Sequence, residues 1–211
     1  EQELNVGHSK MSTGKLEEVP RAYDSREEGR ATAVKNQGSL GICWAYTAIG
    51  ASESRILKKG LDTAPDLSEY HLSYSAYNKA LDPLGLTAKD IMKVREMSND
   101  IYDWGGNDYL AVSALARWQG EVDENVASME ELNALIAQGK TAALSDDLMY
   151  EADSYHLQNA EFVYMSEANR DLIKRKLMQY GAATVSIHAP VSTAEEQKYG
   201  NTGKDNFTSY Y

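Results

Sequence analysis

Apolar residues recur at three- and four-residue steps in the first half of the chain, which predicts helices there. The first predicted helix begins near Cys43 and is capped at its end by Gly60. Its apolar face would hold Trp44, Ala45, Ala48, Ile49, Ala51, Ser52 and Ile56. A second helix is expected after an N-cap at Asp66 or Ser68, and its buried side would hold Leu72, Ala76 and Leu81.

Further helices are predicted where apolar repeats are bounded by capping residues. They cover residues 107–118, 129–138 and 169–180, and they are closed by Gly120, Gly139 and Gly181. Strand signals appear only late, around residues 161–164 and 184–187. Because the helices and the strands are segregated along the chain, the pattern favours an α+β fold over alternating α/β units.

Composition narrows the class of protein further. The 211 residues are 42% hydrophobic, which is a globular value, and 32 acids against 21 bases give a net charge of −11. Such a charge argues against nucleic acid or an anionic membrane as a partner, because both are themselves negative. No apolar stretch approaches the ~20 residues that span a bilayer, so no transmembrane segment is expected. Residues 1–19 resemble a poorly ordered lead-in or a propeptide remnant, and any signal peptide is expected to have been removed.

Cys43 is the only cysteine, so the chain can form neither an internal disulfide nor a multi-cysteine zinc site. It follows a glycine-bearing loop and opens a predicted helix, whose N–H groups and dipole would stabilise a thiolate. Gln37, six residues earlier, could offer a side-chain N–H to an oxyanion beside the N–H of Cys43. The alternative is an ordinary buried thiol, and the loop, the helix start and the glutamine together favour a nucleophile.

The segment Val34-Lys35-Asn36-Gln37-Gly38-Ser39-Leu40-Gly41-Ile42-Cys43-Trp44-Ala45-Tyr46 closely resembles the active-site segment of papain-like cysteine peptidases. Further matches to this family follow in the same order along the chain. They are residues 20–26, Leu67-Ser68-Glu69, Trp104-Gly105-Gly106 and residues 180–187. The resemblance therefore covers roughly residues 20–189.

This resemblance implies a two-lobe papain-like fold with the active-site cleft between the lobes. Residues 20–125 would form the mainly helical lobe that carries the cysteine. Residues 126–211 would form part of a β-rich lobe, an incomplete antiparallel barrel that stops before its histidine and asparagine. The implied catalytic residues are Cys43 as nucleophile and Gln37 as oxyanion donor. The implied substrate-binding residues are Gly41, Trp44, Gly105, Gly106 and Ala183, the last at the floor of the S2 pocket.

The implied reaction is attack of the thiolate on a peptide carbonyl, formation of an acyl-enzyme and its hydrolysis. The expected partner is a protein or peptide substrate. No cofactor is implied and no metal is expected, since the acids at 146–153 lack the glycine and the spacing of an EF-hand loop.

The chain departs from the family in two respects. First, the family's disulfide cysteines are missing, and Leu40 and Ile42 stand where many plant and animal members have Cys and Ser. The resemblance is therefore nearest to disulfide-free bacterial members of the clostridial cell-surface type, which are often attached to further domains. This implies a secreted or cell-surface bacterial protein.

Second, the histidine and asparagine of the family's catalytic set are not evident. His188 lies at about the expected distance from Cys43, but it ends the earlier strand and Pro190 follows it closely. His71 is expected on a helix face, His156 in a loop or at a strand edge, and His8 in the lead-in. Three functions stay open: a cysteine endopeptidase, a catalytically inactive binding protein on the same fold, and an aminopeptidase of the bleomycin-hydrolase type.

Overall fold

The computed structural model describes residues 18–78, 98–145, 148 and 155–186 of the chain. The α-helices in this part are α1 (Cys43–Lys59), α2 (Glu69–Tyr77), α3 (Asp108–Ala116), α4 (Met129–Ala137) and α6 (Arg170–Tyr180). Two short 3₁₀ helices, η1 (Asn99–Tyr102) and η2 (Glu167–Asn169), lie between them. Among these helices, none is both long enough and apolar enough to cross a membrane.

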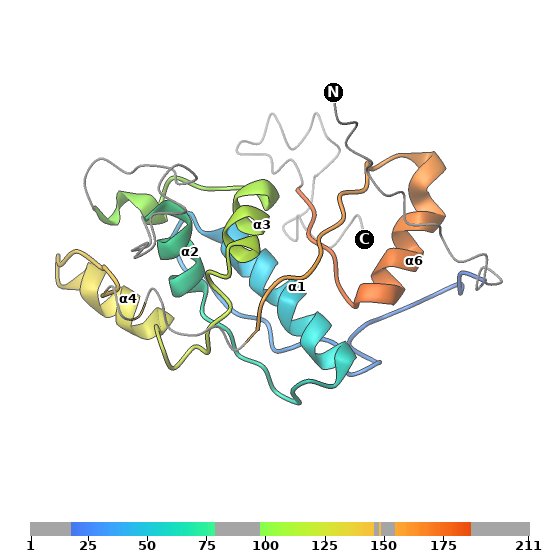
Figure 1. Ribbon diagram of the computed structural model, residues 1–211, viewed down its shortest axis with the longest axis horizontal. Coiled ribbons are helices and arrows are strands. Elements are labelled where there is room, and N and C mark those ends of the chain that lie inside the picture. The colour runs from blue at the N-terminus through green and yellow to red at the C-terminus, as the bar shows by residue number, and fades with distance from the viewer. Residues whose placement is uncertain (1–17, 79–97, 146–147, 149–154, 187–211) are drawn as a thin grey trace, which may run out of the picture.

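Helix α1 lies at the centre of the arrangement, with α2, α3 and α4 on one side of it and α6 on the other (Figure 1). It contacts α2, α3 and α6, and α2 in turn packs against α3, α4 and η1. Helix α4 begins after the expected lobe boundary at residue 125 and nevertheless packs against α2.

The core is built between α1, α2 and α3, where the predicted apolar faces meet. Trp44, Ala45 and Ile49 of α1 are buried, and so are Leu72 and Ala76 of α2, as expected; Leu81 lies outside the described residues. The side chains of Tyr70 and Tyr102 are fully buried beside them with their rings edge to face. By contrast, no residue of α6 is buried.

The predicted N-caps set the starts of two helices. The Ser68 hydroxyl accepts a hydrogen bond from His71 N–H, and the Asn107 side chain accepts one from Leu110 N–H. Ser128 caps α4 in the same way. Each cap satisfies a backbone donor that has no partner inside its helix, and this explains why the helix begins at that residue.

The C-terminal ends of α1, α3 and α4 share one motif, in which a residue with left-handed backbone follows the helix. Gly60 and Gly139 take this position after α1 and α4, as expected for glycine. After α3 the residue is Trp118, with φ at 62°. The prediction that this helix runs to Trp118 and is closed by Gly120 was therefore wrong. The helix ends at Ala116 because Gln119 N–H and Trp118 N–H bond back to its last-turn carbonyls.

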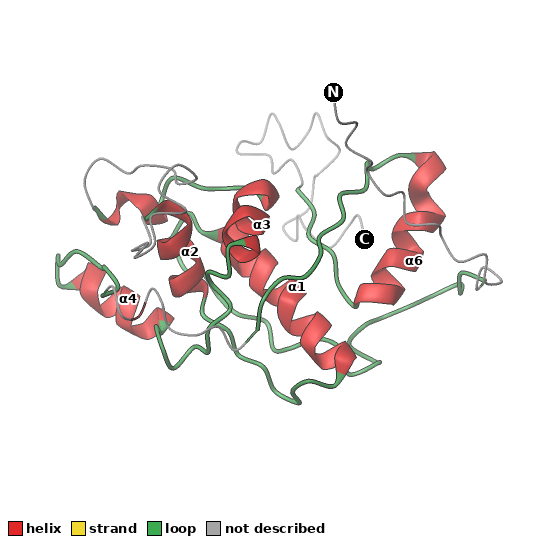
Figure 2. Ribbon diagram, in the orientation of Figure 1, coloured by secondary structure: helices red, strands yellow, loops and turns green. Residues whose placement is uncertain are grey.

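The expected strands were also not found within the described residues. Residues 161–164 and 184–186 form no ladder with a neighbour, and Figure 2 shows loops there. The one isolated antiparallel bridge in the described part joins Leu67 to Asp123. A strand exists only through hydrogen bonds to a partner strand, so a locally strand-like sequence is not sufficient for one.

Candidate active site

Cys43 is the first residue of α1, and its side chain is exposed to solvent. The preceding residue, Ile42, is buried and provides no side-chain cap for the helix. Ala45 N–H and Tyr46 N–H donate to the Ile42 carbonyl oxygen at 3.0 and 3.3 Å, so the N–H groups of Cys43 and Trp44 are the ones in this first turn that an anion beside the thiol could use. The sequence thus places the one thiol at a helix start that no side chain caps.

Residues 36–42, which we call the cysteine loop, hold Gln37 next to this helix start. The Asn36 side chain accepts a hydrogen bond from Gly38 N–H at 2.9 Å and shapes the turn. The Gln37 Nε2 atom donates to the Leu40 carbonyl oxygen at 2.7 Å, which fixes the amide across the loop. A primary amide has two N–H donors, so one remains for an oxyanion after this bond is made.

Residues 103–107, which we call the glycine loop, pack directly against the cysteine loop. Gly41 N–H donates to the Tyr102 carbonyl oxygen at 2.6 Å. A Cβ atom at Gly41 would lie 2.9 Å from Asp103 Cα, and one at Gly106 would lie 2.4 Å from the Trp44 ring. Both glycines are therefore required by close approach. Gly41 lies two residues before Cys43, and Gly106 packs on the ring of Trp44, the residue that follows Cys43.

Ala183, the fifth predicted substrate-binding residue, is exposed and belongs to a segment anchored elsewhere on α1. The Gly181 carbonyl accepts a hydrogen bond from the Ser25 hydroxyl, and a Cβ atom at Gly181 would lie 2.6 Å from Ser54 Oγ. Through Gly181 this segment packs against Ser54 in the C-terminal half of α1, away from Cys43. A place for Ala183 in the S2 pocket remains a prediction.

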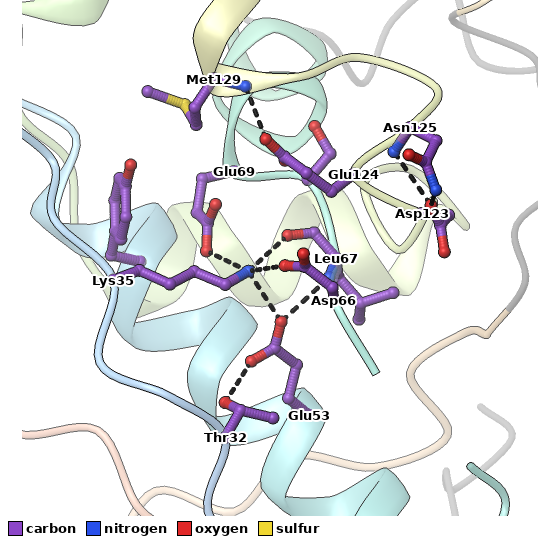
Figure 3. Close-up of polar contacts among 12 residues, drawn as sticks. Thr32, Lys35, Glu53, Asp66, Leu67, Glu69, Asp123, Glu124, Asn125 and Met129 are labelled. Carbon is purple, nitrogen blue, oxygen red and sulfur yellow. Dashed lines mark hydrogen bonds and ion pairs between the residues drawn. The ribbon is translucent and has the colours of Figure 1, made fainter. Parts of the chain in front are cut away.

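Sequence reasoning missed a partly buried ion cluster at the entrance to the cysteine loop (Figure 3). Lys35 Nζ lies 2.9 Å from a Glu53 carboxylate oxygen, 2.7 Å from one of Asp66 and 3.0 Å from one of Glu69. It also donates to the Leu67 carbonyl oxygen at 3.0 Å. Glu53 comes from α1 and Glu69 from α2, so Lys35 joins the loop to both helices.

Two effects set the pKa values around Lys35: the burial of charged groups and the sharing of one cation among three carboxylates. Burial raises the pKa of the Glu69 carboxyl to about 7, and attraction to Lys35 offsets only part of that rise. Burial also acts to lower the pKa of Lys35, but its bonds to Asp66 and Glu53 outweigh this effect and hold that pKa above its ordinary value. Lys35 therefore stays charged.

The two histidines that the structure describes are both engaged away from Cys43. His71 is fully buried on α2, and its ring Nε2 lies 2.8 Å from the Leu148 carbonyl oxygen. His156 lies in a loop and stacks on the Trp118 ring at 4.4 Å. Both placements fit the expectation that neither is the catalytic base. His8 and His188 lie outside the described residues.

No group of three or more residues suited to a metal ion occurs in the described part of the chain. Most of the acidic segment 146–153 lies outside that part. Asn201 and Asn206, the asparagines nearest the C-terminal end, also lie outside it.

Comparison with known proteins gives the same family as the site does. Residues 19–203 match the family model described as papain family cysteine protease. Cathepsin K of Mus musculus is 26% identical over 195 residues, and that of Gallus gallus is 25% identical; each alignment covers 88% of this chain. Cysteine proteinase B of Leishmania mexicana is 40% identical over 65 residues, which are 31% of this chain and 14% of that protein.

The chain spans 58% of the length of both cathepsin K relatives. The family match, however, extends over most of the chain and includes the cysteine loop, the glycine loop and helices α1 to α4. This chain therefore belongs to the papain family of cysteine proteases.

Proposed function

We propose that the protein is a cysteine endopeptidase in which Cys43 attacks the carbonyl carbon of a peptide bond. The C–N bond then breaks, the amine leaves with a proton, and water hydrolyses the thioester to release the acid and the thiol. The observation that carries this proposal is the exposed Cys43 thiol at the uncapped start of α1. A helix start of this kind favours the thiolate over the thiol.

Gln37 and the N–H of Cys43 are the proposed oxyanion donors. The bond from Gln37 to the Leu40 carbonyl fixes the amide within the cysteine loop, so a donor is in place before the charge develops. Donors that need no reorganisation during the reaction stabilise a developing anion most effectively. The proposed substrate-binding surface is formed by Gly41, Trp44, Gly105 and Gly106, with Ala183 assigned to the S2 pocket by resemblance alone.

The proposed mechanism also needs an imidazole base, and we place it outside the described residues. His71 and His156 are excluded because the first is buried on α2 and the second stacks on Trp118. The candidates that remain are His8, His188 and a histidine elsewhere in the full protein. Proton transfer from Cys43 to this base and then to the leaving amine would complete the cycle.

The proposal is tested by the rate at which Cys43 is alkylated at pH 6 by iodoacetamide and by an epoxide. The thiolate, and not the thiol, reacts with both reagents, so a thiol that its surroundings activate reacts faster at this pH than an ordinary one. We therefore expect the folded chain to react at least about tenfold faster than the same chain unfolded in urea. The Cys43→Ala variant should take up no label, since the chain has no other thiol.

A catalytically inactive binding protein on the same fold is the second candidate, and the positions of His71 and His156 favour it. Equal alkylation rates in the folded and unfolded chains would support this second candidate and contradict the endopeptidase. An aminopeptidase of the bleomycin-hydrolase type would show a fast thiol too, but it would cleave only substrates with a free N-terminus.

We also propose that the protein is secreted or held at a bacterial cell surface. It would then be a disulfide-free member of the clostridial type, attached to further domains. Support comes from the Leu40 and Ile42 positions and from the single cysteine of the chain. Fractionation of the source cells with an antibody against the chain tests this location, and recovery of the protein only from cytosol would contradict it.

A further inference from the structure

Tyr77, the last residue of α2, occupies the space beneath the glycine loop. Its side chain is buried, and its hydroxyl donates a hydrogen bond to the Gly105 carbonyl oxygen at 2.6 Å. Its ring meets the Trp44 ring edge to face at a centroid distance of 6.1 Å and the Trp104 ring in the same way at 5.5 Å. One side chain therefore contacts both tryptophan rings and the backbone of the glycine loop at Gly105.

The residues that Tyr77 contacts are the immediate neighbours of the site residues. Trp44 follows Cys43 in α1, and Trp104 precedes Gly105 in the glycine loop. The Trp44 ring also limits how closely Gly106 can approach, since a Cβ atom there would lie 2.4 Å from the ring. The glycine loop thus rests on Trp44, the neighbour of Cys43. Tyr77 contacts Trp44 on one side of this contact and Gly105 on the other.

Asp103 and Gly106 of the glycine loop pack against Gly41 and Trp44, whereas Gly105 is held through its own carbonyl by the Tyr77 hydroxyl. Gly105 has φ at +76°, and a Cβ atom there would meet nothing within 4 Å, so Gly105 faces open space on that side. Trp104 is 53% exposed and so is only partly packed. The Tyr77 hydroxyl bond therefore holds the peptide unit between Gly105 and Gly106.

We propose that Tyr77 is a positioning residue, which holds the glycine loop at the distance from Cys43 at which it binds the backbone of a peptide. This inference rests on the proposed function, because it takes the glycine loop as the substrate-binding edge. Tyr77 touches no reacting atom. It acts through Gly105 and Trp44, so its loss should weaken capture of a peptide and leave the reactivity of the thiol unchanged.

The test compares two alkylating reagents on Tyr77→Phe, which removes the hydroxyl and keeps the ring. Iodoacetamide needs only the thiol, whereas a peptidyl epoxide must also bind along the cleft. Loss of one hydrogen bond predicts a roughly three- to tenfold lower alkylation rate for the peptidyl epoxide and an unchanged rate for iodoacetamide. Tyr155→Phe is the matched control, because its hydroxyl contacts Asp62, just beyond the far end of α1, and it should change neither rate.

Two results would overturn the proposal. Unchanged rates for both reagents would show that the hydroxyl does not position the loop. An equal fall in both rates would show that Tyr77 supports the fold or the thiol instead of the peptide-binding edge.

If Cys43 in the folded native chain is alkylated no faster than in the unfolded chain, the proposed function fails. The position of the glycine loop is then measured directly. In that case amide hydrogen exchange in residues 103–107 should be severalfold faster in Tyr77→Phe than in the native chain, with exchange in α1 unchanged. Equal exchange in residues 103–107 would overturn the positioning role independently of any chemistry at Cys43.

Discussion

At the scale of single residues, one lysine connects the site to its supporting helices. Lys35 lies next to three carboxylates, and the side chains of Glu53 and Glu69 are only 1% and 2% exposed. The Thr32 hydroxyl and the Leu67 N–H also donate to Glu53, so its carboxylate has several partners. Charges this deeply buried are tolerated only while their partners remain in place.

Replacing Lys35 by methionine should therefore destabilise the protein strongly. The change keeps an apolar side chain of similar length and leaves Glu53 and Glu69 buried without their cation, which typically costs about 3–5 kcal/mol. Urea unfolding measures the free-energy difference. The matched control is Arg26→Met, because Arg26 pairs with Asp24 in solvent and its loss should have little measurable effect. Similar effects of the two substitutions would contradict a structural role for the cluster.

Glu69 should make the stability of the protein fall as the pH rises through the neutral range. Its folded-state pKa is raised from 4.5 to about 7, so between these values the folded chain binds more protons than the unfolded chain. The free energy of unfolding then decreases with rising pH over that window. We expect Glu69→Gln to flatten this decline in urea unfolding measured from about pH 5 to about pH 7.5. Identical pH profiles for both proteins would refute the assignment.

The residues of the candidate site differ in how well the sequence reveals them. Cys43 and the glycines of both loops stand out in the sequence because short motifs surround them. Lys35 and Tyr77 do not, since their partners Glu53, Glu69 and Gly105 are distant in sequence and are brought near only by packing. Local pattern carries no information about such pairs.

At the scale of elements, helix starts were predictable and one helix end was not. Ser68 and Asn107 cap the helices as expected, because a side-chain acceptor three residues before a free N–H is a local feature. The end of α3 was missed because Trp118, a residue that rarely adopts left-handed backbone, takes the place usual for glycine. Strands were expected from local sequence signals at 161–164 and 184–187, of which residue 187 lies outside the described part, but strand formation depends on a partner segment.

Gly50 within α1 and Gly60 just after it test how far backbone conformation alone controls helix stability. Gly60 has left-handed backbone with φ at +64°, whereas Gly50 lies within the helix, and a Cβ atom at either would meet nothing within 4 Å. Gly60→Ala should therefore destabilise the protein by about 1 kcal/mol, while Gly50→Ala should stabilise it by about 0.5–1 kcal/mol. Thermal or urea unfolding gives both signs, and effects of the same sign would contradict this explanation.

At the scale of the whole molecule, the two loops of the candidate site are joined without a covalent bond between them. Gly41 N–H donates to the Tyr102 carbonyl, Gly41 packs on Asp103, and Gly106 packs on Trp44. The chain has one cysteine, so none of these contacts depends on an internal disulfide. The contacts that join the two loops therefore do not involve the thiol of Cys43.

The stability of the chain should accordingly be insensitive to reducing agents. We expect the same midpoint of thermal unfolding with and without dithiothreitol, measured by circular dichroism. A chain capped at Cys43 with iodoacetamide is the control, since it cannot form disulfides between molecules. A lower midpoint in reductant for the uncapped chain alone would show that a disulfide between two chains contributes to its stability.

The solitary exposed thiol also makes the protein ready for site-specific spectroscopy. A maleimide dye or a spin label would attach to one atom, at the start of α1, with no need to remove competing cysteines. A reporter there would sit beside both loops, and a second label introduced on α4 would give a distance across the helical part of the molecule. Changes in the distance between α1 and α4 could then be followed in solution.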